Sequence, residues 1–401
     1  MYFDYNATCP VDRKTWEYIS NFSEIPLNAS SPHSHGAKAK KLLEKARHGI
    51  MKYLDIDHGK YEVIFVSSAT EGNNMILKSI SKNMKVYTSK IEHSSVYKVV
   101  KCDRINVDCN GVIDLEHLKK ICKLPEKKLI SIGYANGEIG TIQNMKKIKE
   151  VLDDMKNNEE NNVENDQCFD VNVQGGDENI ERYCGNVIEN RLNNKNVKNK
   201  VGHQENNNML HTDCTQAIGK VKVDLDGFDF ITFSGHKVGA PVGIGVCVFL
   251  KNSISPFLYG GKQEFGMRAG TENVLGALGL EYVLSNLDIE NYINHTTKLK
   301  RKFESFLLTK DKVKIIGKEA ERLSNTVYFI SNKYSNEELL MLLDINGISV
   351  STGSACMAGI NNVSHVITSL GYDKGGIRVS FGMGNTLKEV EKLCKILDDI
   401  L

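Results

Sequence analysis

The sequence predicts an α/β protein: a large domain with a mainly parallel sheet, followed by a smaller α+β domain. Short β-branched runs alternate with helical patterns over about the first 250 residues, which is typical of parallel strands joined by helices. After about residue 275 two helical stretches precede two short strands and a closing amphipathic helix. A chain of 401 residues is also long enough for two domains.

Short apolar runs predict the strands of the large domain. They are Tyr61–Ser68, Lys85–Lys90, Lys128–Ala135, Met209–Asp213, Phe228–Ser234 and Ile244–Leu250. The segment TEGNNMILKSI, which follows the first run, has a helical pattern. In the smaller domain, NTVYFI and GISVS are predicted strands, and LKEVEKLCKILDDIL is the closing helix.

We expect residues 16–291 to form the large domain, and residues 1–15 and 292–401 to form the small one. The stretch at about 156–208 is rich in Asn, Glu and Lys and poor in apolar residues. Such a composition buries too little surface to offset the entropy of ordering, so we expect a disordered insertion. A partner-binding arm is the alternative, but a tolerated insertion is favoured because long surface loops cost little free energy.

Composition and charge exclude several classes of protein. The 51 basic residues nearly balance the 50 acidic ones, so no basic field points to nucleic acid or an anionic membrane. The chain has no apolar run near the roughly 18 residues of a membrane span and no secretory signal, so we expect a cytoplasmic protein. Ten cysteines occur without a C-x-x-C pair or zinc spacing, so most are predicted to be small hydrophobes and no metal site is predicted.

A phosphate site is predicted where the first strand leads into a helix. Ser68 and Glu71 have the spacing of a capping box. The first N–H groups of the helix, at Ala69, and the Thr70 hydroxyl suit a phosphate. Taken alone, this stretch is equally consistent with an ordinary capped helix.

Two further segments bring polar side chains to the same edge of the sheet. Asp213, in HTDCTQAIG, ends a strand, and ligands bind at this edge of open α/β sheets. Its carboxylate either caps the next helix or holds a protonated ring nitrogen, and Gln216 faces the same crevice. His93 follows another strand at this edge.

The segment FITFSGHKVG carries the most specific signal. Lys237 ends an apolar strand, and a desolvated lysine is a good Schiff-base amine. Ser234 and His236 suit the phosphate of the same ligand. A phosphate, a carbonyl that condenses with lysine and a basic ring nitrogen together describe pyridoxal 5'-phosphate (PLP).

The stretch STGSACMAG places Cys356 among small residues, with Gly353 and Gly359 nearby. These neighbours bury a thiol poorly and leave the backbone mobile. We therefore predict an accessible loop here, whereas a buried structural role suits Cys247 in GVCVFL.

In these motifs the chain resembles the cysteine desulfurases of the NifS/IscS kind, which belong to the class-V aminotransferases. The matching segments, in order, are YFDYNATCPVD, NASSPHSHG, SSATEGNN, IEHSSV, GEIGTIQ, HTDCTQAIGK, FSGHKVGAPVGIG, GMRAGTEN, STGSAC and GIRVSFG. They cover essentially everything except the Asn-rich stretch. The resemblance implies the aspartate-aminotransferase-like PLP fold of type I, with a seven-stranded sheet.

The resemblance implies a role for each matching residue. Lys237 would be the Schiff-base lysine and Cys356 the catalytic cysteine. Asp213 would pair with the pyridine nitrogen and Gln216 with the ring hydroxyl, while His93 would stack on the ring and shuttle protons.

The remaining implied contacts involve the cofactor phosphate and the substrate. Asn28 and Arg378 would grip the substrate carboxylate, Arg378 by a bidentate fork. The implied phosphate contacts are Ala69, Thr70, Ser234, His236 and, toward the neighbouring subunit, Thr271.

The implied reaction converts L-cysteine to L-alanine and leaves the sulfur on Cys356 as a persulfide. A homodimer is implied, and so is a sulfur acceptor such as an iron–sulfur scaffold or a tRNA-thiolation factor. No direct contact with nucleic acid or a membrane is expected.

The sequence departs from the family pattern at three places. Gly137 stands where the family usually has Asn, and Asn136 before it would point the other way. Val242 stands where relatives often have Lys. The chain stops at KILDDIL, without the longer tail by which some relatives dock a scaffold, so transfer to that kind of scaffold is less secure.

Two other functions stay open at this point. One is a selenocysteine lyase or another PLP lyase of the same fold, against which the cysteine loop argues. The other is a degenerate family member that binds partners through the Asn-rich stretch.

Overall fold

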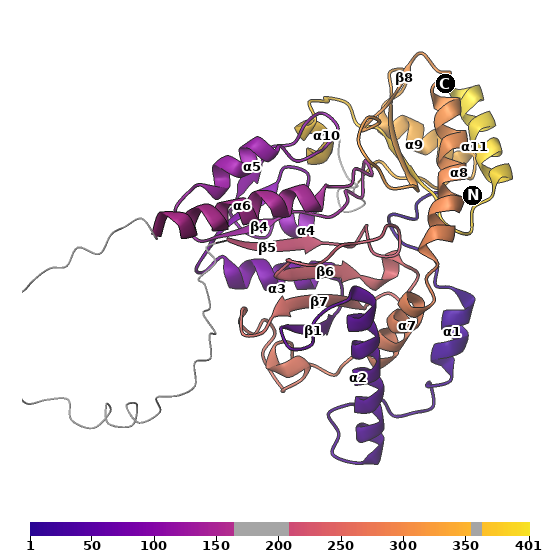
Figure 1. Ribbon diagram of the computed structural model, residues 1–401. Helices are drawn as coiled ribbons and strands as arrows, with labels where there is room; N and C mark the ends of the chain where they lie inside the picture. Colours follow the sequence, from indigo (N-terminus) through magenta and orange to yellow (C-terminus); the bar gives the residue numbers. More distant parts are fainter. Residues whose placement is uncertain (164–207, 354–362) are drawn as a thin grey trace, which may run out of the picture.

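The structure is a computed structural model that describes residues 1–163, 208–353 and 363–401 (Figure 1). Its larger sheet has the strand order β1-β7-β6-β5-β4-β2-β3. All neighbouring pairs are parallel except those of β7, which runs antiparallel to β1 and β6. The strands are β1 (Tyr61–Val66), β2 (Lys85–Ser89), β3 (Asp103–Ile105), β4 (Lys128–Ser131), β5 (Asn208–Asp213), β6 (Phe230–Ser234) and β7 (Gly245–Leu250). The mainly parallel seven-stranded sheet is confirmed.

Helices cover both faces of this sheet, which explains why its strands are continuous apolar runs. Side chains alternate along a strand, so Val63 and Phe65 of β1 enter one core while Ile64 and Val66 enter the other. The first face packs against α2 (Ser34–Leu54), α5 (Leu115–Cys122), α6 (Met145–Val163) and α7 (Val274–Ser285). The second packs against α3 (Ala69–Ile80) and α4 (Ser94–Tyr97).

The smaller sheet, in the order β10-β9-β8, is antiparallel and has a core of its own. Phe3 packs into this core with residues between Leu299 and Leu397, and both termini lie in this part of the molecule (Figure 1). The elements are α8 (Ile289–Leu307), β8 (Val313–Ile315), β9 (Thr326–Ser331), α9 (Asn336–Ile345), α10 (His365–Ser369), β10 (Ile377–Ser380) and α11 (Leu387–Ile400). We propose the division into residues 16–291 against 1–15 and 292–401, which this separate core supports.

Three details differ from the sequence-based expectations. The short strands β3, β8 and β10 were not predicted, and β3, with three residues of which two are charged, carries no apolar run. The predicted strand GISVS is wrong, since only isolated bridges form there, at Ser349 and Ser351. Helix α6 continues to Val163, so the start of the predicted insertion is helical, while residues 164–207 lie outside the described residues.

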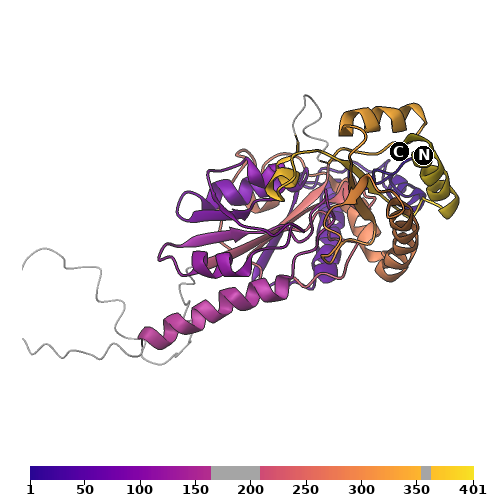
Figure 2. The same ribbon diagram turned by 90° about the horizontal axis from the view of Figure 1, so that it is seen from above.

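Helix α6 lies along one face of the larger sheet, as Figure 2 shows from above. Among the described residues, no helix combines the length and the apolar character that crossing a bilayer requires.

A buried ion pair fixes the segment that follows β7. The guanidinium of Arg47, on α2, binds both carboxylate oxygens of Glu264 at 2.8 and 3.2 Å, and both residues are buried. Glu264 also accepts the Phe65 N–H of β1. It lies in the short helix η2 (Glu264–Gly266), where Glu264 and Phe265 have left-handed backbone angles. The ion pair therefore holds a strained turn against α2 and β1.

We expect Arg47→Met to destabilise the protein strongly, because it leaves the Glu264 carboxylate buried without its partner. The expected loss is about 3–5 kcal/mol of unfolding free energy. The double variant Arg47→Met/Glu264→Gln should recover much of it, as measured by urea unfolding.

The matched control is Arg13→Met, which removes an exposed ion pair with Glu17. Its expected cost is at most about 1 kcal/mol. Equal losses for the Arg47 and Arg13 variants would contradict the structural role of the buried pair.

Candidate active site

A cavity of about 400 Å³ opens at the carboxyl ends of β1, β2, β4, β5 and β6. These strands run in the same direction, so the residues that follow them meet at one edge of the sheet. The predicted site residues in its lining are Ala69, Thr70, His93, Asp213, Gln216, Ser234, His236, Lys237 and Arg378.

Three predicted residues do not line this cavity. Asn28 is exposed, and its side chain accepts the Ser30 N–H. Thr271 is also exposed, and its predicted contact with a neighbouring subunit stays a prediction. Cys356 lies outside the described residues.

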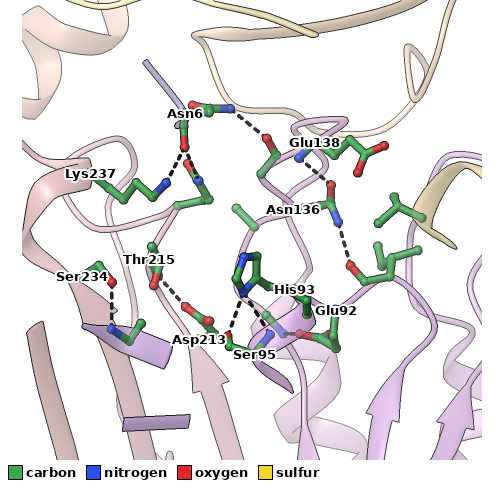
Figure 3. Close-up of a pocket in the computed structure, with 18 of the residues that line it drawn as sticks. Asn6, Glu92, His93, Ser95, Asn136, Glu138, Asp213, Thr215, Ser234 and Lys237 are labelled. Carbon is green, nitrogen blue, oxygen red and sulfur yellow. Dashed lines mark hydrogen bonds between the residues drawn. The ribbon is translucent and has the colours of Figure 1, made fainter. Parts of the chain in front are cut away.

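The carboxylate of Asp213 is fixed at the end of β5. Its Oδ2 accepts from Asn73 Nδ2 at 2.8 Å, and its Oδ1 accepts the Thr215 N–H at 2.9 Å. The residue is buried at the cavity wall, where Figure 3 shows it beside Thr215 and His93. A rigid buried carboxylate here suits a cationic ring nitrogen.

The N-terminus of α3 forms another part of the wall. The Ala69 N–H donates to Ser234 Oγ at 2.7 Å. Thr70 is exposed and lines the cavity. The predicted capping box is wrong, because Ser68 makes no side-chain cap bond and Glu71 instead accepts the Ser67 N–H.

An ion pair turns Glu71 away from the cavity. Arg268 binds its carboxylate at 2.8 Å, and Glu71 is not among the cavity residues. The hydrogen bonds from Arg268 and Ser67 outweigh burial and lower the pKa of Glu71. The Glu71 carboxylate therefore does not compete with a bound anion for the N–H groups at the start of α3.

Lys237 and His236 lie in η1 (Gly235–Lys237), directly after β6. Lys237 Nζ donates to the backbone carbonyls of Asn6 and Ala7 at 2.8 and 2.5 Å (Figure 3). His236 Nδ1 lies 3.1 Å from Thr8 Oγ1. Burial and the charge of Lys237 lower the pKa of His236 to about 4, so the ring is neutral at pH 7.

The His93 ring is oriented by the start of α4. Its Nδ1 accepts the Ser95 N–H at 3.2 Å and lies 2.8 Å from Ser95 Oγ. The neutral ring therefore carries its proton on Nε2, the nitrogen on the side turned to the cavity in Figure 3. The ring surface is open to the cavity but surrounded by protein, and this desolvation lowers the pKa of His93.

Arg378 comes from β10 of the smaller sheet and reaches the same cavity. Its Nη2 binds Asp4 Oδ1 at 2.6 Å, and its Nη1 donates to the Gly137 carbonyl at 3.0 Å. The guanidinium is buried, and its Nε has no hydrogen-bond partner. Because Arg378 lines the cavity, its guanidinium is a candidate partner for a carboxylate ligand.

Asn6 is a functional residue that the sequence reasoning missed. It is buried, its carbonyl accepts from Lys237 and Gln216, and its side chain donates to Thr326 and the Gly137 carbonyl. The only available signal was its place in the matching segment YFDYNATCPVD, because its partners are far away in the sequence.

Gly137 leaves room for Gln216. A Cβ at this glycine would lie 2.9 Å from Gln216 Nε2. The side chain of Asn136 does not replace the missing Asn, because it donates to the Ile91 carbonyl and accepts the Glu138 N–H. The departure from the family pattern thus provides space for Gln216, a predicted cofactor residue.

The cavity suits PLP. Asp213 is placed for a ring nitrogen, Lys237 supplies an amine, and Ser234 with the start of α3 suits a phosphate. Three cavity residues also have a buried polar atom without a hydrogen-bond partner: Thr215 Oγ1, Glu138 Oε1 and Arg378 Nε. Buried polar groups normally have partners, so these atoms indicate a place for a polar ligand.

Residues 1–158 and 188–393 match the family model of class-V aminotransferases. The chain belongs to this family. Cysteine desulfurases named IscS from Clostridium botulinum and Methanosarcina thermophila are each 30% identical over the whole chain, which covers 94% and 92% of their lengths. A similar IscS from Dictyoglomus turgidum is 28% identical over the whole chain and 94% of its own length.

The fold agrees with this assignment. A solved NifS-like protein from Rickettsia africae superposes with a TM-score of 0.81 at 28% identity, covering all of this chain and 99% of that one. The chain therefore has the PLP fold of type I, and PLP is its cofactor.

Glu138 should make folding stability fall as pH rises. Burial raises the pKa of its carboxyl from 4.5 to about 7, so between these values the folded state keeps a proton that the unfolded state has lost. The stability that protonated Glu138 contributes is thus fully present below the pKa of the unfolded state and is lost as pH rises through the pKa of the folded state. Glu138→Gln mimics the protonated acid, and its melting temperature should gain a few degrees on wild type between pH 5 and 8.

The matched control is Glu319→Gln at an exposed turn position, which should show no such pH-dependent gain. If the melting temperatures of Glu138→Gln and wild type differed by the same amount at pH 5 and pH 8, the raised pKa of Glu138 would be contradicted.

Proposed function

We propose that this chain is a PLP-dependent cysteine desulfurase, which converts L-cysteine to L-alanine and passes the sulfur to an acceptor. The observation that carries the proposal is one cavity lined by Lys237, Asp213, His93 and Arg378, in a chain whose relatives are named cysteine desulfurases. No feature of the described residues favours a second function.

Arg378 is the residue that we propose for substrate binding. Its unpartnered Nε is a donor for the cysteine carboxylate, and Asp4 and the Gly137 carbonyl hold the guanidinium in place. The predicted help from Asn28 stays a proposal.

The proposed cofactor contacts come from residues that line the same cavity. Lys237 would hold PLP covalently, with Asp213 at the ring nitrogen and Gln216 at the ring hydroxyl. Ala69, Thr70, Ser234 and His236 would hold its phosphate. When bound, PLP supplies an electron sink for the substrate carbon. His93 would move protons at Nε2, the nitrogen that its contacts with Ser95 leave for the cavity.

Cys356 is the residue that we propose as the sulfur carrier. Its thiolate would attack the sulfur of the bound cysteine, forming the S–S bond of a persulfide as the carbon–sulfur bond breaks. The electron pair of that bond stays with the carbon, which takes up a proton and leaves as alanine. The persulfide sulfur then passes to the acceptor.

The expected activity is formation of alanine from L-cysteine by the purified holoenzyme. Cys356→Ala and Lys237→Ala should each lower the rate by a factor on the order of 10³ or more, because each removes a group that forms a covalent bond in the reaction. Alanine and sulfide are quantified in the presence of a thiol reductant.

The matched control is Cys109→Ala, which removes an exposed cysteine elsewhere and should leave the rate unchanged. A Cys356→Ala variant that still turns over L-cysteine at the wild-type rate would refute the persulfide step. A holoenzyme that releases no alanine would refute the proposed function.

We further propose a cytoplasmic homodimer in which Thr271 contacts the phosphate of the neighbouring subunit. The exposed position of Thr271 outside its own cavity supports this proposal. The acceptor would be an iron–sulfur scaffold or a tRNA-thiolation factor.

The expected mass in solution is about twice the 44.8 kDa of the chain, as measured by light scattering. A holoenzyme that is monomeric at micromolar concentration yet fully active would contradict the shared site.

A further inference from the structure

Lys220 is a buried lysine at the back of the active site. It is 2% exposed, yet no carboxylate pairs with it among the residues that the structure describes. Its Nζ donates instead to two side-chain carbonyls, Asn6 Oδ1 at 2.9 Å and Gln216 Oε1 at 2.5 Å. A lysine without a carboxylate in such a place is costly to bury, so its two contacts need an explanation.

While it is protonated, the Lys220 amine can only donate, and this fixes how both amides are turned. An amide side chain presents a donor on one side and an acceptor on the other. Because Lys220 takes the oxygens, Gln216 Nε2 is left to donate to the Asn6 carbonyl, and Asn6 Nδ2 donates to the Gly137 carbonyl. Asn325 Nδ2 also donates to Asn6 Oδ1, which supports the same orientation.

The same contacts lead to the reactive lysine. The Asn6 carbonyl that accepts from Gln216 also accepts from Lys237 Nζ at 2.8 Å. Lys220, Gln216, Asn6 and Lys237 thus form one hydrogen-bonded chain from the back of the cavity to the amine. Gly137 leaves room for the Gln216 amide, because a Cβ at this position would lie 2.9 Å from Gln216 Nε2.

We propose that Lys220 is a positioning residue that fixes the side-chain amides of Gln216 and Asn6, so that Gln216 presents a donor to the cofactor ring and the Asn6 backbone carbonyl stays in place beside Lys237. The part that concerns the ring rests on the proposed function of the site. Lys220 itself need not touch the substrate.

Lys220 also adds positive charge near the amine of Lys237. Burial lowers the pKa of Lys220 to about 7, and the charges of Lys237 and Arg378 add to this effect. Repulsion between two cations acts on both of them. Below about pH 7, where Lys220 is charged, it disfavours protonation of the groups that it faces. The pKa of His236 is lowered in part by this charge.

The test compares Lys220→Met with Lys222→Met, a matched change two residues away at an exposed lysine. Titration of apo-protein with PLP should show about tenfold weaker binding for Lys220→Met, because the Gln216 amide is free to turn. Lys222→Met should stay within about twofold of wild type. Equal affinities for the two variants would overturn the proposal.

A second readout separates positioning from a general loss of stability. The pH midpoint of the visible absorbance of the bound cofactor should rise in Lys220→Met, by roughly half a unit or more, because a positive charge is removed. Lys220→Arg, which keeps charge and donors, should retain the wild-type midpoint. A lower melting temperature with an unchanged midpoint and unchanged affinity would leave only a structural role and overturn the proposal.

A double-mutant cycle tests whether Lys220 acts through Gln216. In a Gln216→Ala background, Lys220→Met should weaken PLP binding much less than it does in wild type. Purely additive effects would contradict the proposed path. Should Lys220→Met not fold, Lys220→Gln, which lacks the charge, takes its place in the cycle.

None of these measurements uses L-cysteine. A protein that binds PLP as described but forms no alanine would refute the proposed function and leave the role of Lys220 intact. If wild type formed alanine normally and Lys220→Met bound PLP as wild type does, the role of Lys220 would be refuted and the proposed function would stand.

Discussion

The rest of the site depends on the hydrogen bonds that Asn6 makes where the first residues of the chain pass over the edge of the larger sheet. Asn6 is buried, its carbonyl meets Lys237 and Gln216, and its side chain meets Lys220 and Thr326. These bonds join residues next to the larger sheet and the smaller sheet through one residue. They place the wall that carries Lys237 opposite the sheet that carries Arg378.

The direction of the strands explains the other half of the site. Strands β1, β2, β4, β5 and β6 all end at the same edge, so short segments far apart in the sequence become neighbours. Asp213 ends β5, Ser234 ends β6 and His93 follows β2. The smaller sheet adds Arg378 from β10, so elements of both sheets line the cavity.

How far the sequence predicts this structure depends on how local each signal is. The central strands were predictable because both faces are buried and the apolar runs are continuous, whereas β3 is too short to leave a run. Lys237, Asp213 and His93 were predictable because each follows a recognisable strand. Asn6 and Lys220 lie in matching segments, but their roles were not predictable, since they are 214 residues apart and act through contacts that only the fold creates. The capping box failed for the same reason, because Glu71 is bound by the distant Arg268.

The most direct test of this account identifies the lysine that holds the cofactor. The holoenzyme is reduced with borohydride, digested and mapped by mass spectrometry. The account predicts a pyridoxyl group on Lys237, at the end of β6 and next to the Asn6 carbonyl. A pyridoxyl group on Lys220, the buried lysine behind Gln216, or no modified lysine at all, would contradict it.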